Sequence, residues 1–221
     1  MLRVAVLASG RGSNFAALLE SERNPDAGFR LVGLYSDRTE APALQRARAA
    51  GLDAASRSPR DYADRAAFDA ALFGRVARIH PDLIVCAGYM RIISATALAH
   101  LTTPMINIHP SLLPLYPGLD THARALAAGD AEHGVSVHVV TAELDGGPVI
   151  AQARVKVCPG DTPELLAARV LEQEHRLLPA CVRLFANGRL RLTNTQPYLD
   201  DMPLEAPLQL NDGSLVTARS S

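Results

Sequence analysis

Two polar residues, Asn107 and His109, stand two positions apart at the end of the apolar run MINIH. Because side chains alternate across a β-strand, a strand here would place both on the same face. Asparagine offers an amide N–H donor, and histidine offers an imidazole whose charge changes near neutral pH. The pair therefore suits the stabilisation of a developing oxyanion together with a proton transfer. The same spacing is equally typical of two side chains that only satisfy loop carbonyls at a strand end.

A carboxylate for such a site is available at Asp145, in the turn-like sequence ELDGGP. Placed beside His109, it would fix the tautomer of the imidazole and favour the imidazolium form. On local sequence alone, an aspartate before two glycines is more typical of an ordinary turn residue. The sequence contains no HExxH or HxxxH spacing and no GxSxG segment, so we expect neither a catalytic metal nor covalent catalysis.

The segment SGRGSN, residues 9–14, follows the first apolar run and leads into a helical pattern. Glycines let a backbone approach a ligand closely, and a helix start offers N–H groups to an anion, so this segment could hold a phosphate. Phe15 stands where the third glycine of a dinucleotide-binding fingerprint would be. The alternative is a tight strand-to-helix turn with Ser13 or Asn14 as the N-cap.

Short apolar runs alternate with helical patterns through the first half of the chain. The expected strands are 2–8, 30–36, 82–87 and 104–108, and the expected helices are 14–22, 41–51 and 61–79. Repeated β-α units predict an α/β fold with a doubly wound, mostly parallel sheet flanked by helices. In such sheets ligands bind outside the carboxyl ends of the strands, where both polar segments described above would lie.

The second half of the chain has a different pattern. Residues 134–141 and 148–157 predict an antiparallel hairpin around AELDGG, and a long helix is expected from 162 to 186. The segment 195–221 contains several prolines and little periodicity, which predicts a partly irregular surface tail. We therefore expect a single catalytic domain over residues 1–194 and a tail over 195–221.

Composition limits the classes of function. The net charge is −1 without a basic stripe, no apolar run approaches the roughly 20 residues of a membrane span, and the three cysteines show no CxxC spacing. We expect a cytoplasmic enzyme of small-molecule substrates, with no nucleic-acid or membrane partner, as a monomer or homodimer.

Five segments together resemble the phosphoribosylglycinamide formyltransferases, folate-dependent transferases of purine biosynthesis: SGRGSN, AGYMRIIS, INIHPSLLPLYPG, HGVSVHVVTAELDGGPVI and EQEH. They occur in order over nearly the whole chain. The resemblance implies a Rossmann-like fold and transfer of the formyl group of 10-formyltetrahydrofolate, a co-substrate, to the amine of 5-phosphoribosylglycinamide in IMP synthesis. It implies direct attack through a tetrahedral intermediate without a metal, and the catalytic trio Asn107, His109 and Asp145.

The resemblance also implies the binding residues. Gly12, Ser13 and Asn14 would hold the substrate phosphate, and Glu174 its ribose. The implied folate-binding residues are Arg65, Met90, Arg91, Ile92, Ile93, Asn107, Thr141, Ala142, Glu143, Leu144 and Asp145. By spacing alone, Glu174 and Arg65 would more often be solvated surface charges. One departure is Asp120 in GLDTH, where many relatives carry a histidine.

Three other functions compete with this interpretation. Formyltetrahydrofolate deformylase shares much of the site but usually carries an N-terminal regulatory domain, whereas the first strand here is expected at Leu2. Methionyl-tRNA formyltransferase needs an RNA-binding domain and a basic face, and we expect neither from this sequence. A dehydrogenase would need the third glycine and an acidic residue after the second strand, for which Asp37 is a weak candidate.

Overall fold

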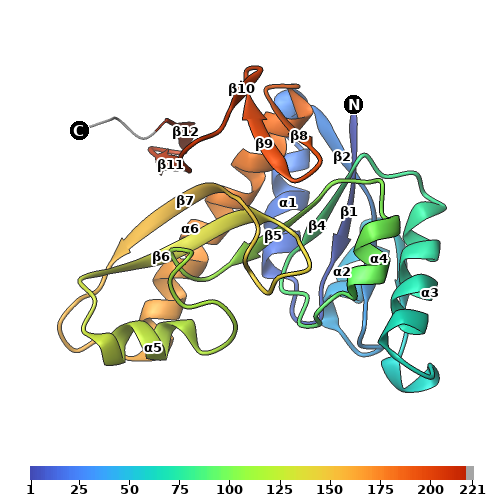
Figure 1. Cartoon of the computed structure of the whole chain (residues 1–221), viewed down its shortest axis with the longest axis horizontal. Coiled ribbons are helices and arrows are strands. Elements are labelled where there is room, and N and C mark those ends of the chain that lie inside the picture. The colour runs from blue at the N-terminus through green and yellow to red at the C-terminus, as the bar shows by residue number, and fades with distance from the viewer. Residues whose placement is uncertain (218–221) are drawn as a thin grey trace. The chain divides into compact units, whose positions relative to one another are not determined.

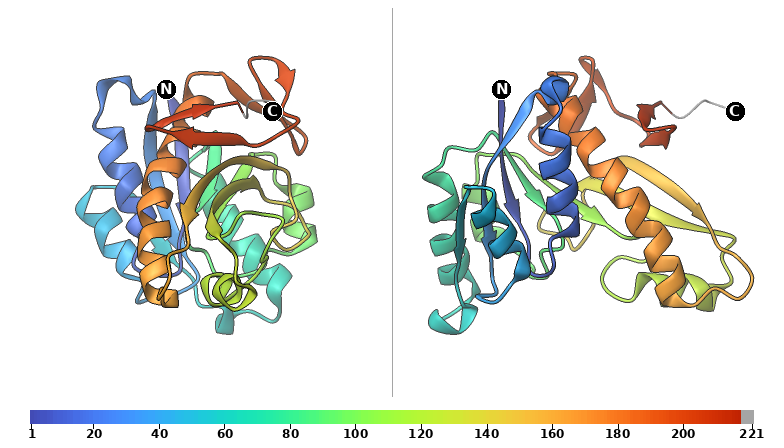
Figure 2. Two further views of the ribbon diagram at one scale, coloured as in Figure 1. Left: turned by 90° about the vertical axis from the view of Figure 1, so that its left-hand side faces the viewer. Right: turned by 180° about the vertical axis from the view of Figure 1, so that it is seen from behind.

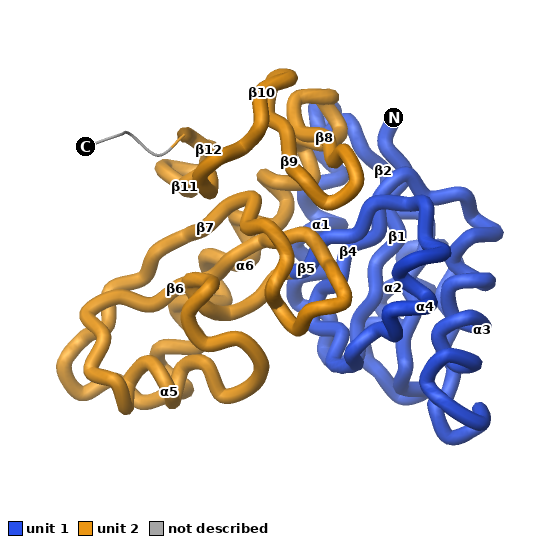
Figure 3. The backbone as a smooth tube through the Cα atoms, in the orientation of Figure 1, with its two compact units in different colours: residues 1–107 blue, residues 108–221 orange. Residues whose placement is uncertain are grey.

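The computed structural model describes residues 1–217. The chain forms two compact units, residues 1–107 and residues 108–221, coloured separately in Figure 3.

The first unit is built on a parallel sheet with strand order β3-β2-β1-β4-β5 (Figure 1). Its strands are β1 (Leu2–Leu7), β2 (Phe29–Ser36), β3 (Asp53–Ser56), β4 (Leu83–Cys86) and β5 (Met105–His109), the last of which continues into the second unit. β4 is fully buried and so is β1 from Val4 onward, as expected for strands covered on both faces. The parallel, helix-flanked sheet predicted from the sequence is therefore confirmed. β3 was not predicted, because its sequence DAAS has no apolar run.

Helices α1 (Ser13–Glu22), α2 (Pro42–Ala49) and α3 (Arg65–Ala77) pack against strand β2, and α4 (Ala95–His100) is a short helix after β4. The predicted helix over 61–79 is shorter than expected. Residues Pro59–Asp61 form a separate 3₁₀ helix, and α3 begins only after Asp64, whose side chain accepts a hydrogen bond from the Ala67 N–H at 2.8 Å. This N-cap satisfies the first turn and sets the start of the helix.

The second unit contains the antiparallel pair β6 (Glu132–Val139) and β7 (Val149–Lys156), preceded by α5 (Thr121–Ala128). The long helix α6 (Pro163–Ala186) packs along this pair (Figure 2). Its start follows the expected pattern, because Thr162 caps the Leu165 N–H and Pro163 occupies the first turn. The predicted hairpin and long helix are confirmed, whereas the eight-residue α5 was not predicted.

The segment predicted as a partly irregular tail contains several strands. β9 (Gln196–Leu199) and β10 (Met202–Pro203) form a separate antiparallel sheet with β8 (Leu190–Thr193), which lies just before this segment. β11 (Leu208–Asn211) pairs in parallel with β7 and antiparallel with β12 (Ser214–Val216). Strands of two to four residues are too short to show a periodic pattern. Residues 218–221 of the predicted tail lie outside the described part. Within residues 1–217, no helix has the length and apolar character needed to cross a membrane.

Candidate active site

His109 ends strand β5 and is buried, with 6% of its surface exposed. Its Nε2 lies 2.9 Å from the carbonyl oxygen of Tyr116. A carbonyl oxygen only accepts, so Nε2 carries the hydrogen and donates it. The other ring nitrogen, Nδ1, lies 3.5 Å from Oδ2 of Asp145. Nδ1 is therefore the nitrogen at which His109 takes up its second proton, and it does so facing a carboxylate.

Asp145 lies in the connection between β6 and β7, with a left-handed backbone (φ 49°). Its Oδ2 also accepts a hydrogen bond from the Gly118 N–H at 2.8 Å, and its Oδ1 lies 3.6 Å from Nε2 of His138. The second unit thus brings His109 and Asp145 together, as the family resemblance implied, although the carboxylate contacts both histidines at slightly more than hydrogen-bond length.

His138 is the neighbour of Asp145 to which the sequence analysis assigned no role. Its Nδ1 lies 3.0 Å from the Val139 carbonyl oxygen and so donates to it, which leaves Nε2 directed at Asp145. The His109 and His138 rings meet edge to face at 6.5 Å. A signal was present in the sequence, because Ser136 and His138 interrupt the apolar strand GVSVHVV at the period of a strand.

The charges of the pair follow from this environment. Burial lowers the pKa of His109 below its usual value, although the Tyr116 carbonyl and Asp145 act in the opposite direction. Burial alone would raise the pKa of Asp145, but the nearby His138 and the hydrogen bond from the Gly118 N–H bring it below the ordinary value. At neutral pH, therefore, an ionised Asp145 carboxylate faces Nδ1 of His109 and favours the uptake of a second proton there.

Asn107 lies on β5 in the first unit, where it is half-buried and pairs with Cys86 of β4. It stands two residues before His109 on the same strand, as the spacing predicted. Cys86 is a buried, unpaired cysteine.

The turn from β1 into α1 depends on Gly12, which has a left-handed backbone (φ 73°) and is the N-cap of α1. A Cβ at this position would stand 2.7 Å from the Cβ of Ala43. No side chain caps the helix, so the alternative with Ser13 or Asn14 as the N-cap is wrong. The first helical hydrogen bond runs from the Ala16 N–H to the Gly12 carbonyl, and the preceding N–H groups form the kind of helix start that attracts anions.

The loop after β4 carries the residues predicted to bind folate in the first unit. Met90 and Ile92 are 56% and 50% exposed, whereas Ile93 is buried and Arg91 lies over the Phe68 ring. The loop is fixed because the Met90 N–H donates to Oγ of Ser9 at 2.9 Å.

Two further candidate residues of the first unit are Asp37 and Arg65. The Ser9 hydroxyl donates to the Asp37 carboxylate at 2.5 Å. The acid that would bind the ribose in a dehydrogenase therefore already accepts a hydrogen bond from within the protein. Arg65, the predicted partner of a folate carboxylate, is the first residue of α3 and is exposed.

The remaining predicted residues lie in the second unit. Ala142, Glu143 and Leu144 are exposed in the connection between β6 and β7, Thr141 is half-buried there, and Glu174 is half-buried on α6. Thr141 donates through its hydroxyl to the Glu143 carbonyl at 3.4 Å, which tightens the connection.

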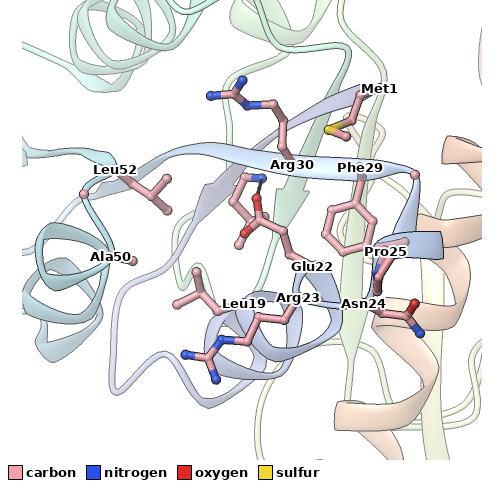
Figure 4. A pocket seen from close by; sticks show the side chains of 14 residues that line it. Met1, Leu19, Glu22, Arg23, Asn24, Pro25, Phe29, Arg30, Ala50 and Leu52 are labelled. Carbon is pink, nitrogen blue, oxygen red and sulfur yellow. Dashed lines mark hydrogen bonds between the residues drawn. The ribbon is translucent and has the colours of Figure 1, made fainter.

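A cavity of about 520 Å³ in the first unit lies elsewhere (Figure 4). Met1 and Phe29 line it, at the amino ends of β1 and β2, together with Leu19, Glu22 and Arg30. The SGRGSN turn follows the carboxyl end of β1, so this cavity is at the wrong end of the sheet for a ligand site. Over residues 1–217, no three His, Cys, Asp or Glu side chains are grouped so that they would hold a metal ion.

Residues 2–182 match the model of the formyl transferase family, and the chain belongs to this family. It is 42% identical to the phosphoribosylglycinamide formyltransferase of Escherichia coli over 92% of this chain and 96% of that protein. The phosphoribosylglycinamide formyltransferase of Coxiella burnetii has a similar solved structure, with a TM-score of 0.85 and 43% identity over 92% of this chain and 95% of that one. The trifunctional purine biosynthetic protein adenosine-3 of Bos taurus is 39% identical over 86% of this chain, which corresponds to 19% of that protein.

Proposed function

We propose that this chain transfers the formyl group of 10-formyltetrahydrofolate to the amine of 5-phosphoribosylglycinamide, a step of purine (IMP) biosynthesis. The observation that carries the proposal is the buried contact of 3.5 Å between His109 and Asp145 in a chain of the formyl transferase family. The relatives are named as phosphoribosylglycinamide formyltransferases, which favours this reaction over hydrolysis by a deformylase.

His109 and Asp145 would perform the proton chemistry. Attack of the acceptor amine on the formyl carbon would place negative charge on the formyl oxygen. When this tetrahedral intermediate collapses, the bond between the formyl carbon and N10 of the folate would break, and N10 would take up the proton that the amine loses. His109 would hold a proton at Nδ1 and donate it toward that oxygen, while the Asp145 carboxylate stabilises the imidazolium from 3.5 Å away. Since Nε2 donates to the Tyr116 carbonyl, the reacting proton is the one at Nδ1. Asn107 would add an amide N–H donor to the same oxygen.

The binding roles are part of the same proposal. The helix start at Gly12, Ser13 and Asn14 would hold the substrate phosphate, because backbone N–H groups and the helix dipole favour an anion there. Glu174 would accept hydrogen bonds from the ribose hydroxyls, for which a half-buried carboxylate is suited.

The residues present also fit a reduced folate, which supplies the activated formyl carbon when it is bound. A pterin ring needs apolar surface and backbone hydrogen bonds, and Met90, Ile92 and Leu144 expose apolar side chains on loops. The exposed guanidinium of Arg65 suits a carboxylate of the folate tail. Arg91, Ile93, Thr141, Ala142 and Glu143 would complete the two folate loops.

We further propose a cytoplasmic enzyme that works on small molecules, without nucleic-acid or membrane partners, as a monomer or homodimer. The three cysteines, Cys86, Cys158 and Cys181, are all unpaired, which supports a reducing compartment.

The test compares consumption of 10-formyltetrahydrofolate with and without 5-phosphoribosylglycinamide. We expect consumption only when the amine acceptor is present, with formylated acceptor as the product. Release of formate at the same rate without acceptor would support a deformylase instead and would overturn the proposal.

A further inference from the structure

One short segment contacts both members of the His109–Asp145 pair. In the 116–118 segment (Tyr116, Pro117 and Gly118), the Tyr116 carbonyl accepts the Nε2–H of His109 at 2.9 Å. Two residues later, the Gly118 N–H donates to Oδ2 of Asp145 at 2.8 Å. The segment therefore determines which nitrogen of His109 faces Asp145 and where the Asp145 carboxylate lies.

The backbone of this segment is not one that the chain would adopt by default. Tyr116 has a φ of 55° and Gly118 a φ of 81°. Glycine accepts a left-handed conformation freely, but a residue with a Cβ is disfavoured there by about 1 kcal/mol. Other contacts must therefore stabilise the left-handed conformation of Tyr116.

Two side chains that have no assigned role do so. The Tyr116 hydroxyl donates to Oδ2 of Asp130 at 2.6 Å, beyond the end of α5. From within α5, Arg124 donates through Nη1 to the Pro117 carbonyl at 2.6 Å and places its guanidinium 5.2 Å from the centre of the Tyr116 ring. The carbonyl and the ring of the segment are thus each anchored by a charged side chain.

We infer that Arg124 and Asp130 are positioning residues, which act through the 116–118 segment on the His109–Asp145 pair. Their effect on rate rests on the proposed function, whereas their effect on the tautomer of His109 does not. If the anchors are removed, the Tyr116 carbonyl moves away from Nε2 and the neutral ring is no longer restricted to the tautomer with hydrogen on Nε2.

The ring of His109 has other charged or titratable neighbours, and they stay in place in this experiment. They are Asp145, His138, His122 and His133, besides Arg124 itself. Because substitution of Arg124 also removes a charge near His109, the variant that decides the matter is Tyr116→Phe, which changes no charge and removes only the bond to Asp130.

The experiment measures the ¹⁵N chemical shifts of the His109 ring and the steady-state kcat and KM of formyl transfer. For Tyr116→Phe we expect the His109 shifts to change from those of a fixed Nε2–H tautomer toward an averaged mixture, with kcat about 10-fold lower and KM within 3-fold. Asp130→Asn, which weakens the same bond from the other side, should give the same shifts. Arg124→Ala should lower kcat further, and Arg124→Lys should recover part of the loss.

The chain offers matched controls. Tyr35→Phe removes the same kind of bond, from the Tyr35 hydroxyl to Asp53 at 2.7 Å, in the first unit. Arg191→Ala removes an arginine that lies 4.4 Å from the ring centre of Tyr198 in the β8–β9 hairpin. Both should leave the His109 shifts and kcat unchanged, apart from any loss of thermal stability.

His109 shifts in folded Tyr116→Phe and Asp130→Asn that equal those of the unsubstituted protein would overturn the inference, whatever the activity. A changed tautomer in a protein without formyl transfer would support the inference and contradict the proposed function instead.

Discussion

Gly12→Ala tests the claim that the turn before α1 depends on the absence of a side chain. Two costs follow from the structure. Alanine at a φ of 73° costs about 1 kcal/mol. Its Cβ would also stand 2.7 Å from the Cβ of the buried Ala43, and overpacking of this kind costs about 1–3 kcal/mol. We expect a loss of about 3 kcal/mol in the free energy of unfolding, or roughly 6–12 °C in Tm for a chain of this size.

The two costs separate in a double-mutant cycle with Ala43→Gly, which removes the clashing Cβ. Ala43→Gly alone should cost about 1 kcal/mol, because α2 gains a glycine. In the double variant the Cβ–Cβ clash disappears, and the backbone cost of Gly12→Ala remains together with a tight contact of 3.1 Å to the Cα of residue 43. The cycle should therefore give a favourable coupling of about 1–2 kcal/mol.

The assay is urea denaturation of the four proteins, with Gly10→Ala as the matched control in the same loop. A Cβ at Gly10 meets no heavy atom within 4 Å, so that variant should change stability by less than about 0.5 kcal/mol. In the kinetic assay, Gly12→Ala should raise the KM for 5-phosphoribosylglycinamide. Strict additivity in the cycle, or a Gly12→Ala protein as stable as Gly10→Ala, would refute the packing argument.

Further predictions concern the proposed catalytic groups, acid stability and thiol reactivity. His109→Ala and Asn107→Ala should each lower turnover by at least 100-fold to 1,000-fold while substrate still binds, and near-normal turnover in either variant would remove that residue from the mechanism. Asp145→Asn should move the pH dependence that reports His109 protonation to lower pH, because the carboxylate raises the pKa of His109; an unchanged profile would leave Asp145 as a turn residue only. Burial lowers the pKa of His133 from 6.5 to about 4, so the unfolded chain binds a proton first as the pH falls, and the free energy of unfolding should drop by up to about 3 kcal/mol between pH 6.5 and 4. His133→Gln should flatten that slope in denaturation measured at several pH values, and an unchanged slope would assign the acid sensitivity to other groups. Cys158 is exposed and the other cysteines are buried, so a thiol reagent should label one cysteine in the folded protein and three in urea; rapid labelling of all three in the folded state would contradict the burial.

The parts of the fold predicted from sequence are those with long, strongly patterned segments. The apolar runs of β1 and β4 and the 24-residue helix α6 carry enough periodicity to be recognised alone. The start of α3 was misplaced because the proline at 59 fits a first helical turn equally well in a 3₁₀ helix. β3 and the strands after residue 195 were not predicted, because their extended conformation depends on pairing with neighbouring strands rather than on a pattern in their own sequence.

The candidate site also has parts that local sequence predicts and parts that it does not. The spacing of Asn107 and His109 indicated a shared strand face, and the turn residues around Asp145 marked a loop. The contact between His109 and Asp145 depends on pairing between segments some 36 residues apart, which local sequence does not encode. The anchors Arg124 and Asp130 gave no signal, because a charged residue on or after an exposed helix is ordinary in any sequence.

The most direct measurement of the central claim follows the fate of a ¹³C-labelled formyl group by NMR during a single turnover with 5-phosphoribosylglycinamide. Formyl transfer by this chain predicts one labelled formamide carbon on the acceptor for each folate consumed, with no labelled formate. Labelled formate in place of the formamide, at a rate independent of the acceptor, would contradict the account.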